Sequence, residues 1–423
     1  MNTFCKKNKQ ILLFITMFLF IFGWKITNLL DIIFIISIIF IFYIAIKKIK
    51  LDFFIIILIL FLWMSIIYGF GISIVKGAFD LTFITRTIRV VINTLGAYGI
   101  IYLYKNTYYK QKNVIHYVLR DLEYVILLHA VIIVIMYLSP IARAFIYSHT
   151  HIVEWGASGS IKLGYRIAGL TYALSQTSVI QMWGILLLIY NHHTNKNKNY
   201  ITFLGKLFVL ILSVLFTGRT GLLLGIIFVP LFLLLINKVK LKVIFKYLFR
   251  FSIGIIAFIF ILFIFKDSIP DKFINYTIAH SSEAISVLTQ GESETLDTIA
   301  QMFIAPEDSL DFLFGTSSLG RSSEVYIKSD VGFVKVLFAV GVVGSIIYYL
   351  CEIACLFSIF VKKKRVSDNS LKYLTFIILI TNLILNLKEL AIYTRNQWSI
   401  IIILVLINYN QSKLNPDIKQ LED

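Results

Sequence analysis

The sequence predicts an all-α polytopic membrane protein, a bundle of about 12 transmembrane helices with one large external loop between the ninth and tenth spans. Of the 423 residues 58% are hydrophobic and only 15% are charged, whereas soluble domains carry about 25% charged residues. The hydrophobic residues form long runs that do not alternate with period two, so they predict helices and exclude a β-barrel. Residues 1–423 are expected to form a single integral membrane domain.

Twelve apolar runs set the order of the predicted spans. They are Ile11–Trp24, Leu29–Ile46, Leu51–Phe70, Ile88–Leu103, Val118–Leu138, Ala168–Tyr190, Ile201–Phe216, Leu222–Ile236, Phe251–Phe265, Gly332–Phe360, Leu371–Leu387 and Trp398–Tyr409. A transmembrane helix needs about 20 residues, and several of these runs are shorter. The last run must therefore borrow from Ala391–Gln397 or be tilted and embedded among the other helices.

The formal net charge of +17 has a membrane explanation. Lys and Arg gather in alternate connections, as cytoplasmic loops require, so no nucleic-acid partner is expected and both termini are predicted to be cytoplasmic. The basic connections hold Lys6/Lys7/Lys9, Lys47/Lys48/Lys50, Lys105/Lys110/Lys112, Lys196/Lys198, Lys238/Lys240/Lys242/Lys246/Arg250 and Lys362/Lys363/Lys364/Arg365. The predicted external segments are 71–87, 139–167, 266–331 and 388–397.

Segment 266–331 is the large external loop, with 11 acidic against 4 basic residues. Ala284–Leu288 and Leu296–Phe303 read as amphipathic helix, and Pro306 and Gly315 read as breakers. Together with the hydrophobic stretch Phe312–Phe314, this pattern predicts a packed cap rather than a disordered loop.

Four arginines on the predicted external side lie in unusual settings: Arg166, Arg219, Arg321 and Arg395. An Arg at a bilayer boundary is often only an anchor that extends to the headgroups. Arg219 has the stronger functional signal, because it lies in the turn Thr217–Gly221 between two short spans. Ionisable groups at membrane depth normally face a polar cavity, and the glycines of this turn would let backbone amides approach an anion.

Converging arginines without a metal-ligand cluster suit a diphosphate group. The planar guanidinium matches phosphate oxygens and stays charged, so it would stabilise a departing diphosphate during glycosyl transfer. The acceptor hydroxyl then needs a base, for which the candidates are Asp330, Glu324, Glu154 and His280. Asp330 or Ser329 could equally cap the helix that follows.

Three other polar groups are given structural interpretations. Asp121, Glu123 and His129, with Arg120 nearby, are expected to form an ion pair within the bundle rather than a proton relay. His149 and His151 have no third ligand at an obvious spacing, so no metal site is predicted. Cys351 and Cys355 fall within one span, which argues against a metal or redox pair.

Several of these motifs resemble one family. Thr217–Gly221 is similar to an Arg-Ser/Thr-Gly turn, and Arg166-Ile-Ala-Gly169 to an Arg-x-x-Gly step. The stretch Gly315–Gly344 combines a Phe-Gly turn, a Ser-Asp-x-Gly entry and a later Gly-x-x-Gly. These motifs, the number of spans and the late large loop resemble Wzy-type polysaccharide repeat-unit polymerases, which are related to O-antigen ligases.

The resemblance implies a polymerase of surface polysaccharide, O-antigen or capsule, in the bacterial cytoplasmic membrane. It would move the growing glycan from undecaprenyl diphosphate to a sugar hydroxyl of the next lipid-linked unit, on the outer face. No metal, cofactor or nucleotide sugar is implied, and a flippase and a chain-length regulator would be its protein partners. The expected catalytic residues are Arg166, Arg219 and Asp330, and the expected substrate-binding residues are Arg321, Lys328, Glu324, His280, Lys162 and Arg395.

Three other functions remain open at this point. A lipid-linked oligosaccharide flippase would share the number of spans and the intramembrane Arg, but it needs no 66-residue external loop and would show two related halves. An O-antigen ligase would share the arginines and transfer a finished glycan to another acceptor. A structural membrane scaffold would give no reason for Arg at short spans.

Overall fold

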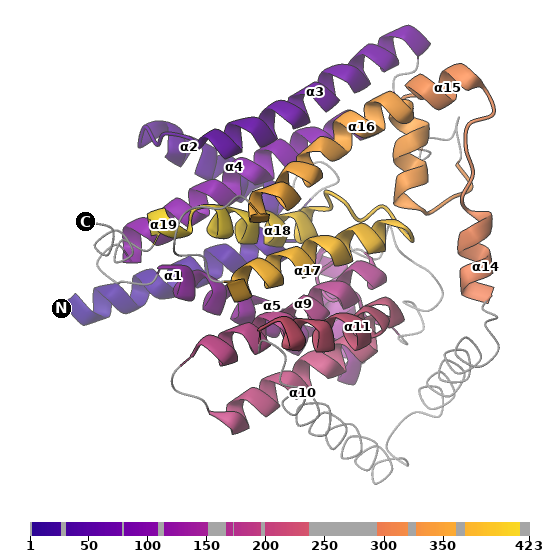
Figure 1. The fold of residues 1–423 in the computed structure, drawn as a ribbon. Helices are drawn as coiled ribbons and strands as arrows, with labels where there is room; N and C mark the ends of the chain where they lie inside the picture. Colours follow the sequence, from indigo (N-terminus) through magenta and orange to yellow (C-terminus); the bar gives the residue numbers. More distant parts are fainter. Residues whose placement is uncertain are drawn as a thin grey trace.

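The computed structural model describes residues 2–26, 31–77, 80–108, 114–150, 166–171, 173–195, 199–236, 294–319, 327–360 and 369–414. Every named element within these ranges is a helix (Figure 1). The helices are α1 (Asn2–Phe22), α2 (Ile32–Ile46), α3 (Phe53–Lys76), α4 (Thr82–Tyr108), α5 (Val114–Leu138), α6 (Pro140–Thr150), α9 (Leu174–Thr194), α10 (Tyr200–Thr217), α11 (Arg219–Ile236), α14 (Glu294–Gln301), α15 (Ser309–Phe314), α16 (Gly332–Phe360), α17 (Asn369–Asn386), α18 (Arg395–Tyr409) and α19 (Gln411–Leu414).

Seven of the described helices are long and apolar enough to cross a membrane: α3, α4, α5, α10, α11, α16 and α17. Residues Asn8–Phe22 of α1 and the whole of α2 form shorter apolar helices. The helical fold class is therefore confirmed and is consistent with a membrane protein. The count of 12 spans stays a prediction, since the run Phe251–Phe265 lies outside the described residues.

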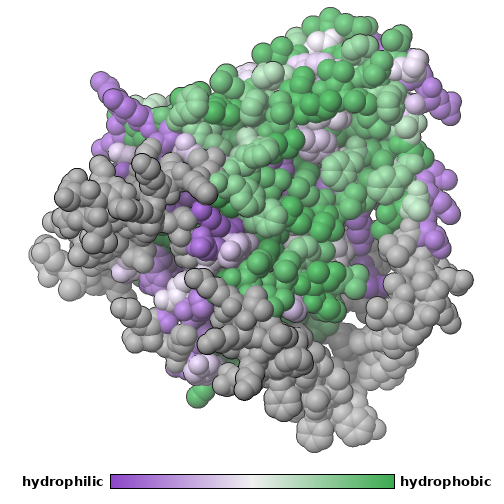
Figure 2. Space-filling model, in the orientation of Figure 1, coloured by the Kyte–Doolittle hydropathy of each residue, from purple (hydrophilic) through white to green (hydrophobic). Residues whose placement is uncertain are grey.

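The outer surface of the bundle is largely apolar. On α3, Phe53 is 73% exposed and Val75 is 80% exposed, at opposite ends of the helix. Figure 2 shows a broad hydrophobic area across the upper part of the molecule, with hydrophilic side chains toward its left and right margins. An exposed apolar area of this extent needs an apolar environment, which the hydrocarbon core of a bilayer supplies.

The bundle has two ends, which are named here by what lies at them. At the terminal end α1 begins and α18 ends, on the left of Figure 1; at the loop end α3 ends and α15 lies, on the right. The Lys76 ammonium pairs with the Asp311 carboxylate at the loop end. The Tyr68 hydroxyl donates to the carbonyl of Phe314 over 3.3 Å. These contacts fasten α15 to α3.

Helix α18 lies in the centre of the bundle. Every residue from Asn396 to Asn408 is buried, and a helix that is buried all round needs no polar face. The sequence left two options for this short run, and both are realised: the helix borrows three residues, starting at Arg395, and it is embedded.

The structure corrects two predicted span boundaries that matter for function. The run that begins at Ala168 is not helical at its start, because residues 166–171 form a bend and a turn and α9 begins at Leu174. In addition, α4 begins at Thr82 rather than Ile88. The longer α4 includes Arg86, which the apolar run had excluded.

The turn that holds Arg219 is also shorter than predicted. Helix α10 ends at Thr217 and α11 begins at Arg219, so Gly218 alone lies between them. Arg219 is therefore the first residue of a helix. An N-terminal helical position adds the partial positive charge of free backbone N–H groups to that of the side chain.

Helix α16 is interrupted, although its apolar run predicts one continuous span. Gly341 has φ 64° and ψ −172°, a conformation that residues with a Cβ avoid. The carbonyls that lose their helical partners at the break accept hydrogen bonds from the segment that follows α15. Thr316 N–H donates to the carbonyl of Phe338 over 2.7 Å, and Ser317 N–H donates to that of Ala339 over 2.8 Å. The Gly-x-x-Gly motif thus begins at a helix break.

The described part of the large loop agrees in part with the predicted cap. Helix α14 matches the amphipathic stretch at Leu296–Phe303, and Gly315 ends α15 with φ 92°. The apolar stretch is less packed than predicted, because α15 has no buried residue and Phe312 and Phe314 are 39% and 44% exposed. Ala284–Leu288 lies outside the described residues.

Candidate functional site

The α10–α11 junction is held against the start of α9. The backbone N–H of Gly221 donates to the Ser178 hydroxyl over 3.0 Å. A Cβ at Gly221 would overlap the backbone carbonyl of Ser178, so only glycine permits this approach. The backbone of Arg219 is consequently held at the loop end of the bundle, and its side chain is half-buried there.

The segment that carries Arg166 reaches the same junction. The backbone N–H of Ile167 donates to the carbonyl of Phe216, in the last turn of α10, over 2.9 Å. Gly169 turns the chain with φ 62°, and Leu170 N–H then donates to His129 Nε2 over 2.9 Å. Arg166 and Arg219 are 53 residues apart in sequence. Both therefore lie next to the C-terminal end of α10.

Residues 387–394, between α17 and α18, form a non-helical segment inside the protein. Leu390, Ala391, Ile392 and Tyr393 are at most 6% exposed. Buried irregular backbone must find hydrogen-bond partners within the protein. Arg86 supplies one set: its guanidinium donates to the carbonyls of Leu390 and Ile392 over 3.3 and 2.8 Å.

Asn386 supplies the second set of partners for this segment. Its side-chain oxygen accepts from the backbone N–H groups of Ala391 and Ile392 over 3.1 and 3.3 Å. The Gln176 amide adds a long bond, 3.4 Å, to the carbonyl of Leu390. Helices α4, α9 and α17 together hold the segment in place.

Asn386→Ala is expected to lower the stability of the protein, because it leaves two buried N–H groups without an acceptor, at about 1–3 kcal/mol for each. The melting temperature of the detergent-solubilised protein would fall, and protease cleavage between residues 387 and 394 would increase. Asn106→Ala is the matched control, since Asn106 is exposed at the other end of the bundle. Equal melting temperatures of the two variants would contradict the role given to Asn386.

The segment brings a cation and a carboxylate to the α10–α11 junction. The Lys388 ammonium donates to the hydroxyl of Thr220, the residue after Arg219, over 2.9 Å. Next to it, Glu389 is half-buried and its Oε1 is shielded from solvent. We call Arg166, Arg219, Thr220, Lys388 and Glu389 the junction site.

The electrostatics of Glu389 are unusual for a carboxyl group. Burial raises its pKa to about 7, and the negative charge of Asp330 adds to the shift. Lys388, Lys335 and the backbone N–H of Gln176 act in the opposite direction. At neutral pH this carboxyl is consequently a mixture of protonated and ionised forms.

Asp330, the base candidate next to α16, lies at the surface of the protein. Its carboxylate is 73% exposed and pairs with the Lys335 ammonium over 3.2 Å. The hydroxyl of Ser329, the alternative cap, accepts from the N–H of Val331 over 3.2 Å at the start of α16. Lys328 beside them is exposed.

Arg395 belongs to a second cluster. It pairs with the Asp31 carboxylate over 3.5 Å, and Arg89 approaches the same carboxylate oxygen at 3.9 Å. Asp31 also accepts from Phe34 N–H and caps α2. Four of the predicted site residues, Lys162, His280, Arg321 and Glu324, and the candidate base Glu154 lie outside the described residues.

Sequence reasoning missed Glu389, Lys388, Arg86, Gln176 and Lys335 as site residues. Two signals were available. Lys388 and Glu389 form an adjacent charged pair inside a short external segment between apolar runs, and Arg86 and Arg89 have the i, i+3 spacing of one helix face. Gln176 and Lys335 gave no comparable signal, since neither has a charged neighbour at i±3 or i±4 in its run.

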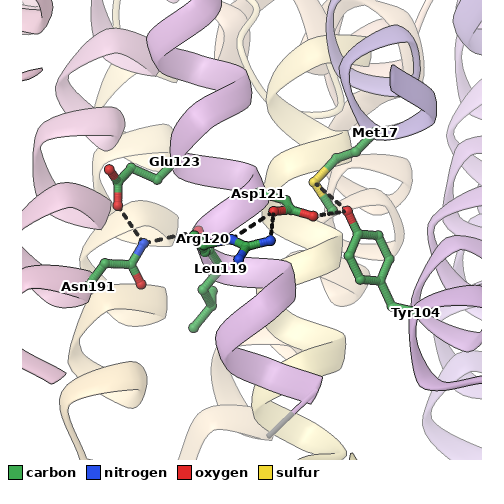
Figure 3. Close-up of polar contacts among 7 residues, drawn as sticks. All are labelled: Met17, Tyr104, Leu119, Arg120, Asp121, Glu123 and Asn191. Carbon is green, nitrogen blue, oxygen red and sulfur yellow. Dashed lines mark hydrogen bonds and ion pairs between the residues drawn. The ribbon is translucent and has the colours of Figure 1, made fainter. Parts of the chain in front are cut away.

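The polar residues at the terminal end form two ion pairs. Asp121 pairs with Arg120 over 2.8 Å and accepts from the Tyr104 hydroxyl over 2.9 Å (Figure 3). Glu123 pairs with Lys206 over 2.7 Å. The predicted intrabundle ion pairing is confirmed for both carboxylates. His129 is not part of it, because it contacts Leu170 and Gln181.

No group of three or more His, Cys, Asp or Glu side chains that could hold a metal ion occurs within the described residues. Cys351 and Cys355 are buried, free thiols in α16. No protein-family model, curated protein or solved structure matched the chain.

Proposed function

We propose that the chain polymerises lipid-linked oligosaccharide units, transferring the growing glycan from undecaprenyl diphosphate to a sugar hydroxyl of the next unit. The loop end would face the outside of a bacterial cytoplasmic membrane, the termini the cytoplasm, and the complete bundle would have 12 spans. The proposal rests first on the motif resemblance at Arg166–Gly169, Thr217–Gly221 and Gly315–Gly344.

The observation that carries the proposal is the meeting of three cationic segments at one helix junction. The Arg166 segment binds the end of α10 through Ile167, Arg219 begins α11, and Lys388 binds Thr220. Three cations from three separate segments, beside a helix N-terminus, suit a diphosphate group.

The proposed reaction needs little more than this charge. The acceptor hydroxyl oxygen attacks the anomeric carbon of the donor glycan, and the bond from that carbon to the diphosphate oxygen breaks. The electron pair of that bond leaves with the diphosphate, whose growing negative charge the fixed cations stabilise. Arg321, Lys328, Glu324, His280, Lys162 and Arg395 remain proposed substrate-binding residues, and Asp330 is the candidate base that the sequence motifs suggest.

The test uses purified protein in lipid vesicles with a lipid-linked repeat unit and no nucleotide. The expected result is a ladder of longer lipid-linked glycans that requires the protein. Movement of the unit between leaflets without elongation would favour a flippase and overturn the proposal. Transfer only to an added second acceptor would favour a ligase.

A further inference from the structure

Glu389 belongs to none of the sequence motifs, but its carboxyl group lies beside the cations of the junction site. It follows Lys388 directly, and the Lys388 ammonium is fixed on Thr220. Thr220 in turn follows Arg219. Any diphosphate held by Arg219 and Lys388 would therefore have the Glu389 carboxyl as a neighbour.

The Glu389 carboxyl is held in place from several sides. The backbone N–H of Gln176, in the first turn of α9, hydrogen-bonds to it. The backbone N–H of Glu389 itself donates to Leu385 over 3.0 Å. The segment that follows is fastened by Arg86 through Leu390 and Ile392. A base that works by proton transfer needs such a fixed position.

One oxygen of this carboxyl group is an unsatisfied hydrogen-bond acceptor within the described residues. Glu389 Oε1 is shielded from solvent and has no hydrogen-bond partner among the described residues. Buried polar atoms are nearly always hydrogen-bonded, so each exception asks for an explanation. A substrate hydroxyl that donates to Oε1 would supply the missing partner.

We propose that Glu389 is the general base of the transfer reaction and takes the proton from the acceptor sugar hydroxyl. The assignment rests on the proposed function. As the hydroxyl oxygen bonds to the anomeric carbon, its proton moves to Glu389, and the diphosphate leaves with the electrons of the broken bond. Glu389 later gives the proton to water.

Asp330 is the weaker candidate for this role. Its carboxylate is 73% exposed and already paired with Lys335. Glu389 is shielded and faces Lys388 on its own segment, Gln176 on α9, Lys335 on α16, and Asp330 just before α16. The Asp330–Lys335 pair instead tunes the pKa of Glu389, because Asp330 raises this pKa and Lys335 lowers it.

The first test is Glu389→Gln in the ladder assay. Loss of a general base is expected to slow elongation by about 10²- to 10⁴-fold, while the concentration of lipid-linked donor that gives half-maximal rate changes little. Glu307→Gln, an exposed carboxyl on the same loop end, is the control and should retain the wild-type rate. Gel filtration and thermal melting would establish that both variants fold.

The second test is the dependence of the elongation rate of Lys335→Met on pH. If Glu389 had only a structural role, this pH profile would be the same as that of the wild type. The base must be ionised, so wild-type elongation should rise with pH through about 7. Lys335 lowers the pKa of Glu389, so its removal should shift this rise to higher pH. This measurement keeps the assignment testable if Glu389→Gln does not fold.

The outcomes separate the two proposals. A wild-type ladder that Glu389→Gln retains at full rate, or a Lys335→Met profile without a shift, would overturn the assignment of the base alone. A wild-type protein that makes no ladder would overturn the proposed function and the assignment with it.

Discussion

Arg219→Ala is expected to reduce ladder formation by about 10²- to 10³-fold, the usual effect of removing one fixed group that stabilises charge in a transition state. Arg219 begins α11, and the N–H of Gly221 two residues later is tied to Ser178. The guanidinium therefore starts from a rigid helix end.

Arg219→Lys separates charge from geometry. Lysine keeps the positive charge but loses the planar, forked set of donors that binds two phosphate oxygens at once, so an intermediate rate is expected. Lys47→Ala is the matched control, because Lys47 is exposed at the terminal end and its loss should leave the rate unchanged. A full ladder from Arg219→Ala would remove Arg219 from the proposed mechanism.

Hydropathy predicted the helices well and the junction site poorly. An apolar run reports that residues are buried, not whether lipid or protein buries them. Ile167, Ala168 and Leu170 are as apolar as any span, yet they lie in a turn. They pack where the backbone of Ile167 binds the end of α10, a contact that no local pattern contains.

The hydrogen-bond partners of the non-helical segment before α18 could not be predicted from the sequence either. Arg86 lies before the apolar run at Ile88, so hydropathy placed it in a loop; the structure places it in α4 with its guanidinium on the carbonyl of Leu390, 304 residues away in sequence. The motif at Thr217–Gly221 was recognisable because its glycine and hydroxyl positions are local. Glu389 could be recognised as a site residue only from the folded structure, because its neighbours come from α9 and α16.

A large stability effect is expected at the terminal end, from Lys206→Met. Lys206 and Glu123 pair over 2.7 Å with side-chain exposures of 17% and 3%, and the Lys206 ammonium also lies 4.0 Å from the centre of the Tyr124 ring. Removing the cation leaves Glu123 with the amide of Asn191 as its described partner. Breaking a buried pair in this way costs about 3–5 kcal/mol.

The double variant Lys206→Met with Glu123→Gln distinguishes this explanation from a general packing defect. A neutral Gln at position 123 can still accept from the Asn191 amide, so no unpaired charge stays buried and most of the lost stability should return. Lys76→Met is the control: its pair with Asp311 is more exposed, at 33% and 26%, and exposed pairs contribute only about 0–1 kcal/mol. Unfolding of the detergent-solubilised proteins by denaturant would measure all three. Equal losses for Lys76→Met and Lys206→Met, or no recovery in the double variant, would show that the charge of Glu123 is not what Lys206 compensates.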